Sequence, residues 1–207
     1  MSGHLATRLV ALAVIGTALY FFPLVRLVPL GGSNPAQAEG YDAAVAATAF
    51  WTDRLGAAIA GADDAALVAT AMADDPAEAG ERFGIRKGVG KGFDLFIQGR
   101  GKVVDKTTAG VLLRLTPAGV VLLRTGPVFG STIRDAVGAG AEPRPPTSRD
   151  GNDLANEINR LAEERAVVLL VDAQVGETLR FAGCAKVSSP ARWRGPLELS
   201  PVLVEVP

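Results

Sequence analysis

The fold is decided by residues 93–136, which read FDLFIQGRGKVVDKTTAGVLLRLTPAGVVLLRTGPVFGSTIRDA. Three stretches of alternating or continuous apolar residues in this segment have the pattern of β-strands. Turns that contain glycine or proline separate them, and Gly126-Pro127 ends the third. Gly101 and Gly126 lie where strands bend or end, so we expect a missing Cβ to matter at both.

The three strands and the helix that follows have definite limits. We expect the first strand at residues 93–104, with a bulge or bend at the GRGK motif of residues 99–102, because small barrels place glycine at their corners. Residues 111–115 and 120–123 then form a hairpin. A short helix is expected at residues 132–137.

Beyond this segment the sequence predicts a long helix and further strands. A proline-rich loop at residues 141–146 precedes the helix, which Asn152 or Asp153 can cap. Strands are expected at residues 167–171, 178–187 and 197–206, the first of them buried.

The predicted order is a bent long strand, a hairpin, a helix between the third and fourth main strands, and then two more strands. This is the layout of a five-stranded OB-type Greek-key barrel. We therefore expect an α+β fold in which residues 93–207 form an OB-like β-barrel. An open α+β sandwich with its helices on one face is the alternative.

Residues 41–84 form a small helical segment ahead of the barrel. Apolar residues recur at helical spacing over residues 41–59, which predicts an amphipathic helix of about five turns. The aspartates at residues 63–64 can cap a second helix. Asp75, followed by proline, can cap a third, which Gly84 ends.

The N-terminal residues 1–30 have the pattern of a signal-anchor that spans the inner membrane. Residues 9–25 are uncharged and apolar, which is at the lower limit of length for a membrane-spanning helix, and Arg26 marks the exit. A cleaved signal peptide could use the Ala-Gln-Ala site at residues 36–38, but that site lies far from the apolar run, so an anchor is favoured. Both interpretations place the remainder, after a linker at residues 31–40, in the periplasm.

Histidine and cysteine are too scarce for most catalytic centres. Because His4 is the only histidine and Cys184 the only cysteine, neither a Ser-His-Asp centre, a usual zinc site nor an intramolecular disulfide can be assembled. No cysteine is available for acylation of the leader. Cys184 lies in an alternating apolar run and is expected to be a small buried side chain. We expect no enzyme, cofactor or metal site, although catalysis by carboxylates alone stays open.

Charge and composition argue against a nucleic-acid binder. The formal net charge is −1, basic residues are scattered, and an aromatic content of 6% leaves few stacking platforms. The glycine-rich residues 85–92 follow a helix and open a strand, the reverse of a phosphate-binding loop, so we interpret them as a linker. Trp51 lies at an inward helical position and is expected in the core rather than on a ligand.

Arg134 and Asp135 are the best polar candidates for a binding site, together with Arg100. They follow the Gly-Pro turn, and polar residues on such turns are well placed for recognition. The alternative is an exposed or locally paired Arg-Asp on a short helix, without function. A concave polar pocket that contains Arg100 and Arg134 would favour ligand binding, whereas a flat apolar patch would favour docking of a protein.

Several of these motifs resemble the predicted periplasmic lipoprotein family filed as domain of unknown function 2291. The resemblance covers nearly the whole chain, and its most specific element is the combination of Gly-Pro-Val with Arg-Asp-Ala. The resembling segments are residues 22–30 (FPLVRLVPL), 41–43 with Trp51, 93–104, 125–136, 156–159 (NEIN) and 176–183.

The resemblance implies an envelope protein with no known catalytic residues, associated with a sugar ABC import system. Two departures limit it: the lipobox cysteine of many members is absent, and EPRPPTSRD replaces an aromatic-rich segment at residues 142–150. The leading hypothesis is a membrane-anchored periplasmic binding or accessory protein. A structural envelope scaffold that docks another protein is second, and an enzyme is third.

Overall fold

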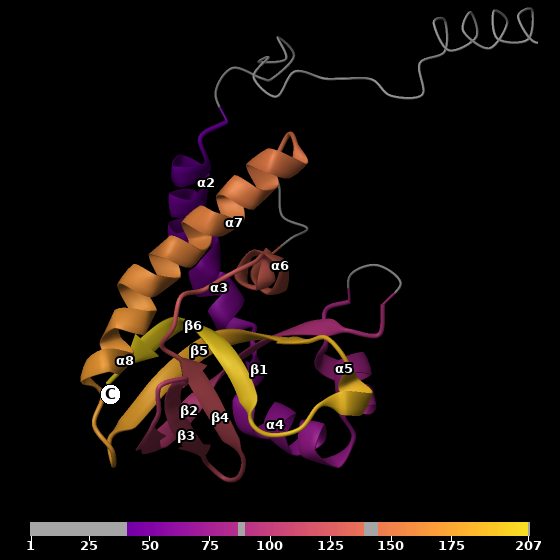
Figure 1. The fold of residues 1–207 in the computed structure, drawn as a ribbon, viewed down its shortest axis with the longest axis vertical. Coiled ribbons are helices and arrows are strands. Elements are labelled where there is room, and N and C mark those ends of the chain that lie inside the picture. Colours follow the sequence, from indigo (N-terminus) through magenta and orange to yellow (C-terminus); the bar gives the residue numbers. More distant parts are fainter. Residues whose placement is uncertain (1–40, 87–89, 139–144, 207) are drawn as a thin grey trace, which may run out of the picture. The chain divides into compact units, whose positions relative to one another are not determined.

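The computed structural model describes residues 41–86, 90–138 and 145–206, and its centre is a ring of five strands (Figure 1). The order around the ring is β2-β3-β4-β6-β5, and β5 pairs back with β2. Neighbours are antiparallel except β4 and β6, which are parallel. The strands are β2 (Phe93–Lys106), β3 (Gly110–Leu115), β4 (Val120–Arg124), β5 (Thr178–Val187) and β6 (Leu197–Glu205).

This ring confirms the predicted order of the main strands. It is the connectivity of an OB-type barrel, with helices between the third and fourth long strands. The open sandwich is excluded because β5 pairs with β2 along ten residues of each strand. A two-residue strand that was not expected, β1 (Asp63–Asp64), pairs in parallel with β2 outside the ring.

Gly101 of the long strand is needed because a neighbouring strand comes close to its Cα, and not because of a bulge. The bulge between β2 and β3 falls at residues 103–105, so a bulge at residues 99–102 is wrong, whereas a bend there stays a prediction. At Gly101 an added Cβ would lie 2.9 Å from the Cβ of Leu113, which confirms that β2 needs a missing side chain there. At Gly126 an added Cβ would meet open space, so that expectation is wrong.

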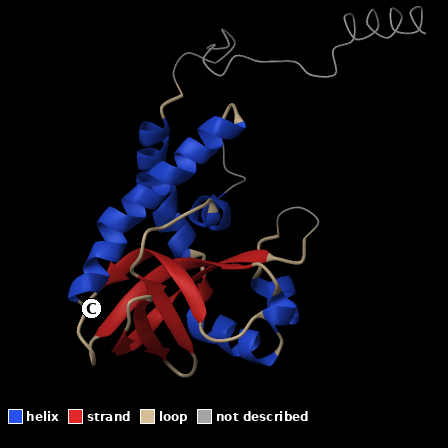
Figure 2. Ribbon diagram, in the orientation of Figure 1, coloured by secondary structure: helices blue, strands red, loops and turns tan. Residues whose placement is uncertain are grey.

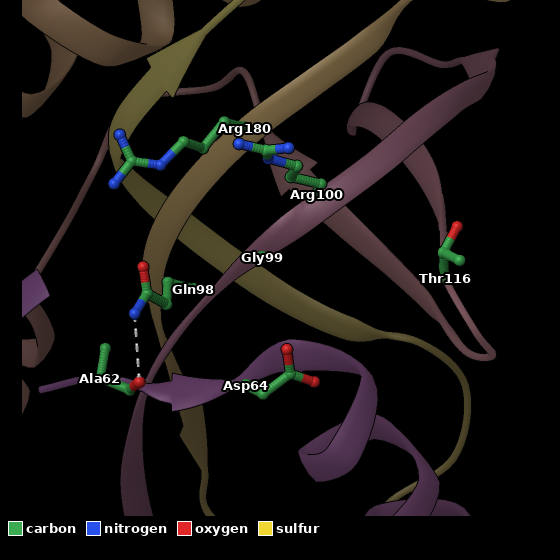
Figure 3. A pocket seen from close by; sticks show the side chains of 7 residues that line it. All are labelled: Ala62, Asp64, Gln98, Gly99, Arg100, Thr116 and Arg180. Atoms are coloured by element: carbon green, nitrogen blue, oxygen red, sulfur yellow. Dashed lines mark hydrogen bonds between the residues drawn. The ribbon is translucent and has the colours of Figure 1, made fainter. Parts of the chain in front are cut away.

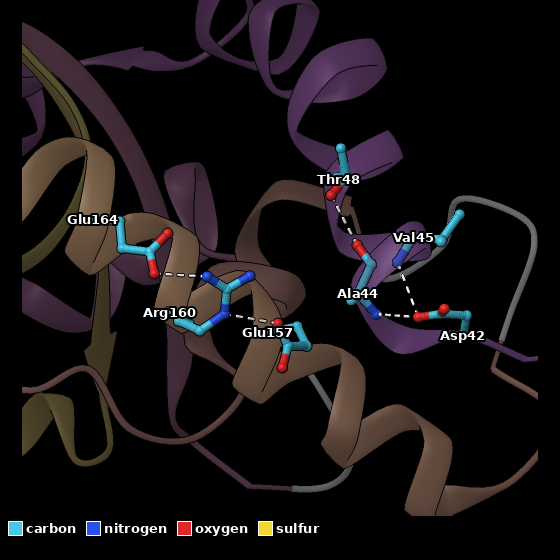
Figure 4. A network of polar contacts seen from close by, with 7 residues as sticks. All are labelled: Asp42, Ala44, Val45, Thr48, Glu157, Arg160 and Glu164. Atoms are coloured by element: carbon cyan, nitrogen blue, oxygen red, sulfur yellow. Dashed lines mark hydrogen bonds and ion pairs between the residues drawn. The ribbon is translucent and has the colours of Figure 1, made fainter.

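The helices at the start of the described chain confirm the predicted caps. An unbroken helix comprises α2 (Ala43–Ala49), a π-helical turn η1 (Phe50–Arg54) and α3 (Leu55–Ala60). Asp42 begins it: its Oδ1 accepts from the backbone N–H of Ala44 at 2.9 Å (Figure 4). Asp64 and Asp75 cap α4 (Ala65–Asp74) and α5 (Pro76–Phe83) in the same way.

A second unbroken helix replaces one predicted strand. It comprises α7 (Ser148–Ala162), a π-helical turn η2 (Glu163–Val167) and α8 (Val168–Asp172), so the strand expected at residues 167–171 is wrong. Residues 163–165 continue the helix without a glycine or proline to end it. Only Leu170 of α8 is buried, which is a helical and not a strand pattern.

The start of this helix also differs from its prediction. Thr147 and Asp150 form a reciprocal capping box: the Thr147 Oγ1 accepts from the Asp150 N–H at 3.1 Å, and the Asp150 Oδ2 accepts from the Thr147 N–H at 3.1 Å. Asn152 and Asp153 therefore lie inside the helix. Farther along, Arg160 donates to carboxylates one turn away on either side (Figure 4).

The apolar residues form two cores on the two sides of the barrel wall. The inner core fills the barrel and is closed by side chains of α4 and α5 and by Leu170 of α8. The outer core lies between the outer face of β2, β5 and β6 and the helices α2, α3, α6 (Thr132–Gly138) and α7 (Figure 2). The buried strand residues that these helices cover are Phe96, Ala182, Cys184 and Val202.

The predicted segments at the N-terminus are outside this description. The leader, the site at residues 36–38, the linker at 31–40 and most of the loop at 141–146 do not fall in the described ranges. Among described residues, no helix is long and apolar enough to cross a bilayer. From residue 41 onward the chain belongs to one compact unit, to which the helices of the 41–84 segment contribute parts of both cores.

Candidate functional site

Arg100 lies on the outer face of the barrel, directly opposite Arg180. The two residues are Cα partners in the antiparallel pairing of β2 with β5. The helices that cover Phe96 do not reach this part of β2, so the Arg100 side chain is exposed. It lines a pocket of about 430 Å³ (Figure 3). The lining residues are Ala62, Asp64, Gln98, Gly99, Arg100, Thr116 and Arg180.

Neighbouring elements fix the polar groups at the other end of the pocket. Asp64 is held by its capping role, because its Oδ1 accepts from two backbone N–H groups of α4, each at 2.9 Å. The Gln98 Nε2 donates to the carbonyl of Ala62 at 3.4 Å. Figure 3 shows the two arginines at one end of the pocket and Asp64 at the other. A ligand therefore meets hydrogen-bond donors and acceptors at opposite ends.

The outer face around the pocket carries an excess of positive charge. Lys102 and Arg114 are also directly opposite each other, in the pairing of β2 with β3, and both are exposed. Of these four cations only Arg180 has a carboxylate partner in the described chain, Glu205, at 2.8 Å. Like charges placed opposite each other destabilise a sheet. An anionic group would relieve this repulsion, and guanidinium groups suit such a group best.

Arg134 and Asp135 lie elsewhere, where α6 meets α7. The Arg134 guanidinium donates to Asp135 and to the carbonyl of Gly151 in α7, and the Ser131 Oγ donates to Asp135 at 2.7 Å. The two side chains are only 25% and 13% exposed. The expectation that the pair is exposed is therefore wrong, whereas local pairing of the two residues is confirmed. The structure does not bring Arg100 and Arg134 into one pocket.

Tyr41, just ahead of the first helix, lies at the same junction. Burial raises the pKa of its hydroxyl, with a further contribution from the charge of Asp150, while the charge of Arg134 lowers it. Tyr41, two residues ahead of α2, therefore lies close enough to Asp150 in the first turn of α7 and to Arg134 of α6 for their charges to affect it. This makes the region around Arg134 a packing junction of three helices.

Cys184 and Trp51 are structural, as the sequence predicts. Cys184 is buried in β5, and burial, followed by the charge of Asp94, raises the pKa of its thiol, so the nucleophilic thiolate is disfavoured. Trp51 packs against the outer core, and the Arg165 guanidinium lies 5.5 Å from its ring centroid. The described residues contain no cluster of three side chains able to hold a metal ion.

Sequence reasoning missed Arg180 and a second cavity. Arg180 could be recognised only from the register of β2 with β5. The second cavity, about 230 Å³, lies between the turn at residues 126–130 and the ends of β4, β5 and β6. The signal in the sequence was an aromatic residue, Phe129, directly after Gly-Pro-Val in a turn. Its lining residues are Arg124, Gly126, Pro127, Val128, Phe129, Thr132, Cys184, Lys186, Glu198 and Ser200.

Comparison with known proteins agrees with this architecture. No curated protein sequence matches the chain significantly. The crystal structure of an OB-fold protein from Thermotoga maritima superimposes with a TM-score of 0.70 at 23% identity, covering 82% of this chain and all of the other, which shows a shared fold. The model of the predicted periplasmic lipoprotein family, DUF2291, matches residues 14–205, and the chain belongs to this family.

Proposed function

We propose that this protein is a membrane-anchored periplasmic binding protein that serves a sugar ABC import system and holds an acidic sugar in the Arg100 pocket. The observation that carries the proposal is the pair Arg100 and Arg180 on adjacent strands of one pocket. The Arg100 guanidinium makes no hydrogen bond or ion pair with side chains or carbonyls in the described part of the chain, so its donors are available to a ligand.

The remaining lining of the pocket suits hydroxyl groups. Asp64 accepts hydrogen bonds, the Thr116 hydroxyl both donates and accepts, and Gln98 adds an amide. A carboxylate at the arginine end and hydroxyls at the Asp64 end together describe a sugar acid. Ligand pockets are typically about 300–1,000 Å³, and this pocket of about 430 Å³ is in the range for one sugar unit or two.

The membrane attachment that we propose is the apolar run of residues 9–25. The family is described as lipoproteins, but residues 1–40 contain no cysteine, and the thiol of Cys184 is buried in β5. N-terminal sequencing of the membrane fraction tests this step. An intact leader supports the anchor, and a mature chain that starts at Glu39 contradicts it.

Calorimetry with the full chain in detergent tests the ligand. We expect glucuronate to bind and glucose to bind at least about tenfold more weakly, because the charge-assisted hydrogen bonds to the carboxylate are lost. Arg100→Gln should abolish this preference. Arg149→Gln is the matched control, because Arg149 is exposed on α7 and lies outside the lining of the pocket. Equal binding of glucuronate by wild type and Arg100→Gln would contradict the proposal.

The second candidate is a structural role in the envelope, in which the chain docks another protein and binds no ligand. It is favoured by the apolar side chains of Val168, Leu169 and Val171 on α8, which are exposed. Co-purification from detergent-solubilised membranes distinguishes the two roles. A partner lost with Val171→Lys but kept with Arg100→Gln, in a protein that binds no acidic sugar, would favour the scaffold.

A further inference from the structure

We propose a second binding site, formed by the turn at residues 126–130 and the adjoining ends of β4, β6 and β5, which takes a small zwitterion such as an apolar α-amino acid. This site shares no lining residue with the Arg100 pocket. This proposal can therefore be tested separately from the function proposed above.

Side chains from the long helix fix the backbone of the turn on both sides of Phe129. The Val128 N–H donates to the Glu163 Oε1 at 2.7 Å, and the Asn159 Nδ2 donates to the Gly130 carbonyl at 2.8 Å. Asn159 is only 4% exposed, so its amide is committed to this contact. Gly130 has φ +79°, a left-handed conformation that favours glycine. The turn is thus held in one conformation.

Phe129 projects from this fixed turn into solvent. Its side chain is 79% exposed, the highest value among the large hydrophobic side chains that are described. A buried aromatic ring of this size adds substantially to core stability, and Phe129 forgoes most of that contribution. An exposed aromatic on a rigid turn, at the edge of a cavity, is the arrangement expected of a ligand platform.

Three charged side chains line the cavity beside this ring. β6 lies between β4 and β5, and Glu198 of β6 is the Cα partner of Leu122, two residues before Arg124. On the other side, Lys186 follows two residues after Cys184, the partner of Ser200. Strand alternation places all three charges on one face, with Glu198 between the two cations.

None of these three charges is paired in the part of the chain that is described. No ion pair within 4.0 Å joins Glu198 to Arg124 or Lys186, although all three line one cavity. Opposite charges on neighbouring strands stabilise a sheet when they pair, and these three charges do not pair with one another. The open arrangement leaves room for a ligand that supplies the missing partners.

The charges select a zwitterion. A carboxylate can bind Arg124 or Lys186, on either side of Glu198, and an ammonium group can bind Glu198 itself. A simple anion would be opposed by Glu198, and a simple cation by the two bases. The cavity of about 230 Å³ restricts the ligand to a small molecule, and Phe129 offers an apolar surface for its side chain.

Calorimetry on the full chain in detergent tests this assignment with three matched ligands. We expect phenylalanine to bind, and both 3-phenylpropionate, which lacks the ammonium group, and phenethylamine, which lacks the carboxylate, to bind at least about tenfold more weakly. Binding of either analogue as tightly as phenylalanine would overturn the zwitterion. Absence of heat with all three, and with leucine, would overturn the site.

Variants show whether the site is at the turn. Phe129→Ala and Glu198→Gln should each weaken phenylalanine binding at least about fivefold while the thermal midpoint changes little, because both side chains are exposed. Val120→Ala and Glu78→Gln are the matched controls, exposed residues outside the cavity, and should bind as wild type. Unchanged binding by Phe129→Ala and Glu198→Gln would place the ligand elsewhere and overturn the proposal.

Discussion

Arg100 and Arg134 are arginines of similar prominence in the sequence, yet the fold treats them in opposite ways. Arg134 is held at the α6–α7 junction by Asp135 and by a carbonyl of α7, and it is largely covered. Arg100 is exposed on the barrel wall beside a pocket, and its guanidinium has no hydrogen-bond or ion-pair partner among the described residues. A charged residue that follows a turn is therefore not always exposed to a ligand, since a later helix can pack over it.

The difference is set by where the helical layer ends. On the outer face of β2, Phe96 is buried under the helices, whereas Arg100, four residues farther along, is exposed. The outer core thus stops between these two residues. Beyond that boundary the wall of the barrel is available for binding, and within it polar groups serve to join helices to one another.

The largest loss of stability is expected from a substitution at Gly101, the residue next to Arg100. A Val side chain at Gly101 would clash with the Cβ of Leu113, so Gly101→Val should lower the free energy of unfolding by about 3 kcal/mol. Gly126→Val is the matched control and should cost under about 1 kcal/mol, because the space there is open. Urea midpoints measure both. Equal shifts would show that the strand contacts of β2 are misassigned.

Arg134→Ala should come next, with a loss of about 2 kcal/mol in the free energy of unfolding, because it removes the guanidinium that donates both to the largely buried Asp135 carboxylate and to the Gly151 carbonyl. A double-mutant cycle with Asp135→Ala measures the coupling, which should exceed about 0.5 kcal/mol for groups in direct contact. Purely additive losses would contradict a structural pair at this junction.

A smaller loss of stability is expected when the N-terminal cap of α7, the helix that covers Arg134, is removed. Thr147→Ala removes one half of the capping box and should cost about 1 kcal/mol. Asn152→Ala tests the cap that the sequence suggests, and it should cost less, because Asn152 lies inside the helix and is exposed. The reverse order in thermal denaturation would restore the predicted helix start.

The fold was largely predictable because its signals are local. Alternation, turn glycines and aspartate caps predict the five strands and the first three helices. The prediction of a strand at residues 167–171 was wrong because a continuous run of Val and Leu shows neither a strand nor a helix periodicity. Its helical conformation depends on the uninterrupted helix that precedes it. The capping box at Thr147 was missed because its partner, Asp150, lies next to other plausible caps.

The candidate sites were less predictable because they depend on register. Arg100 becomes part of a pocket only when β5 places Arg180 opposite it, and that pairing joins residues far apart in the sequence. The charges at Arg124, Lys186 and Glu198 likewise meet only in the closed barrel. Burial of Arg134 depends on how α7 packs on α6, which no local pattern indicates.

The most direct measurement compares Arg100→Gln with Arg134→Gln in the full chain, each by urea denaturation and by glucuronate calorimetry. We predict that Arg100→Gln keeps the wild-type midpoint to within about 0.5 kcal/mol in free energy of unfolding and loses glucuronate binding. Arg134→Gln should lose stability and, at a temperature where it is folded, bind as wild type. An Arg134→Gln variant that folds normally but does not bind, beside an Arg100→Gln variant that still binds, would contradict this division between the two arginines.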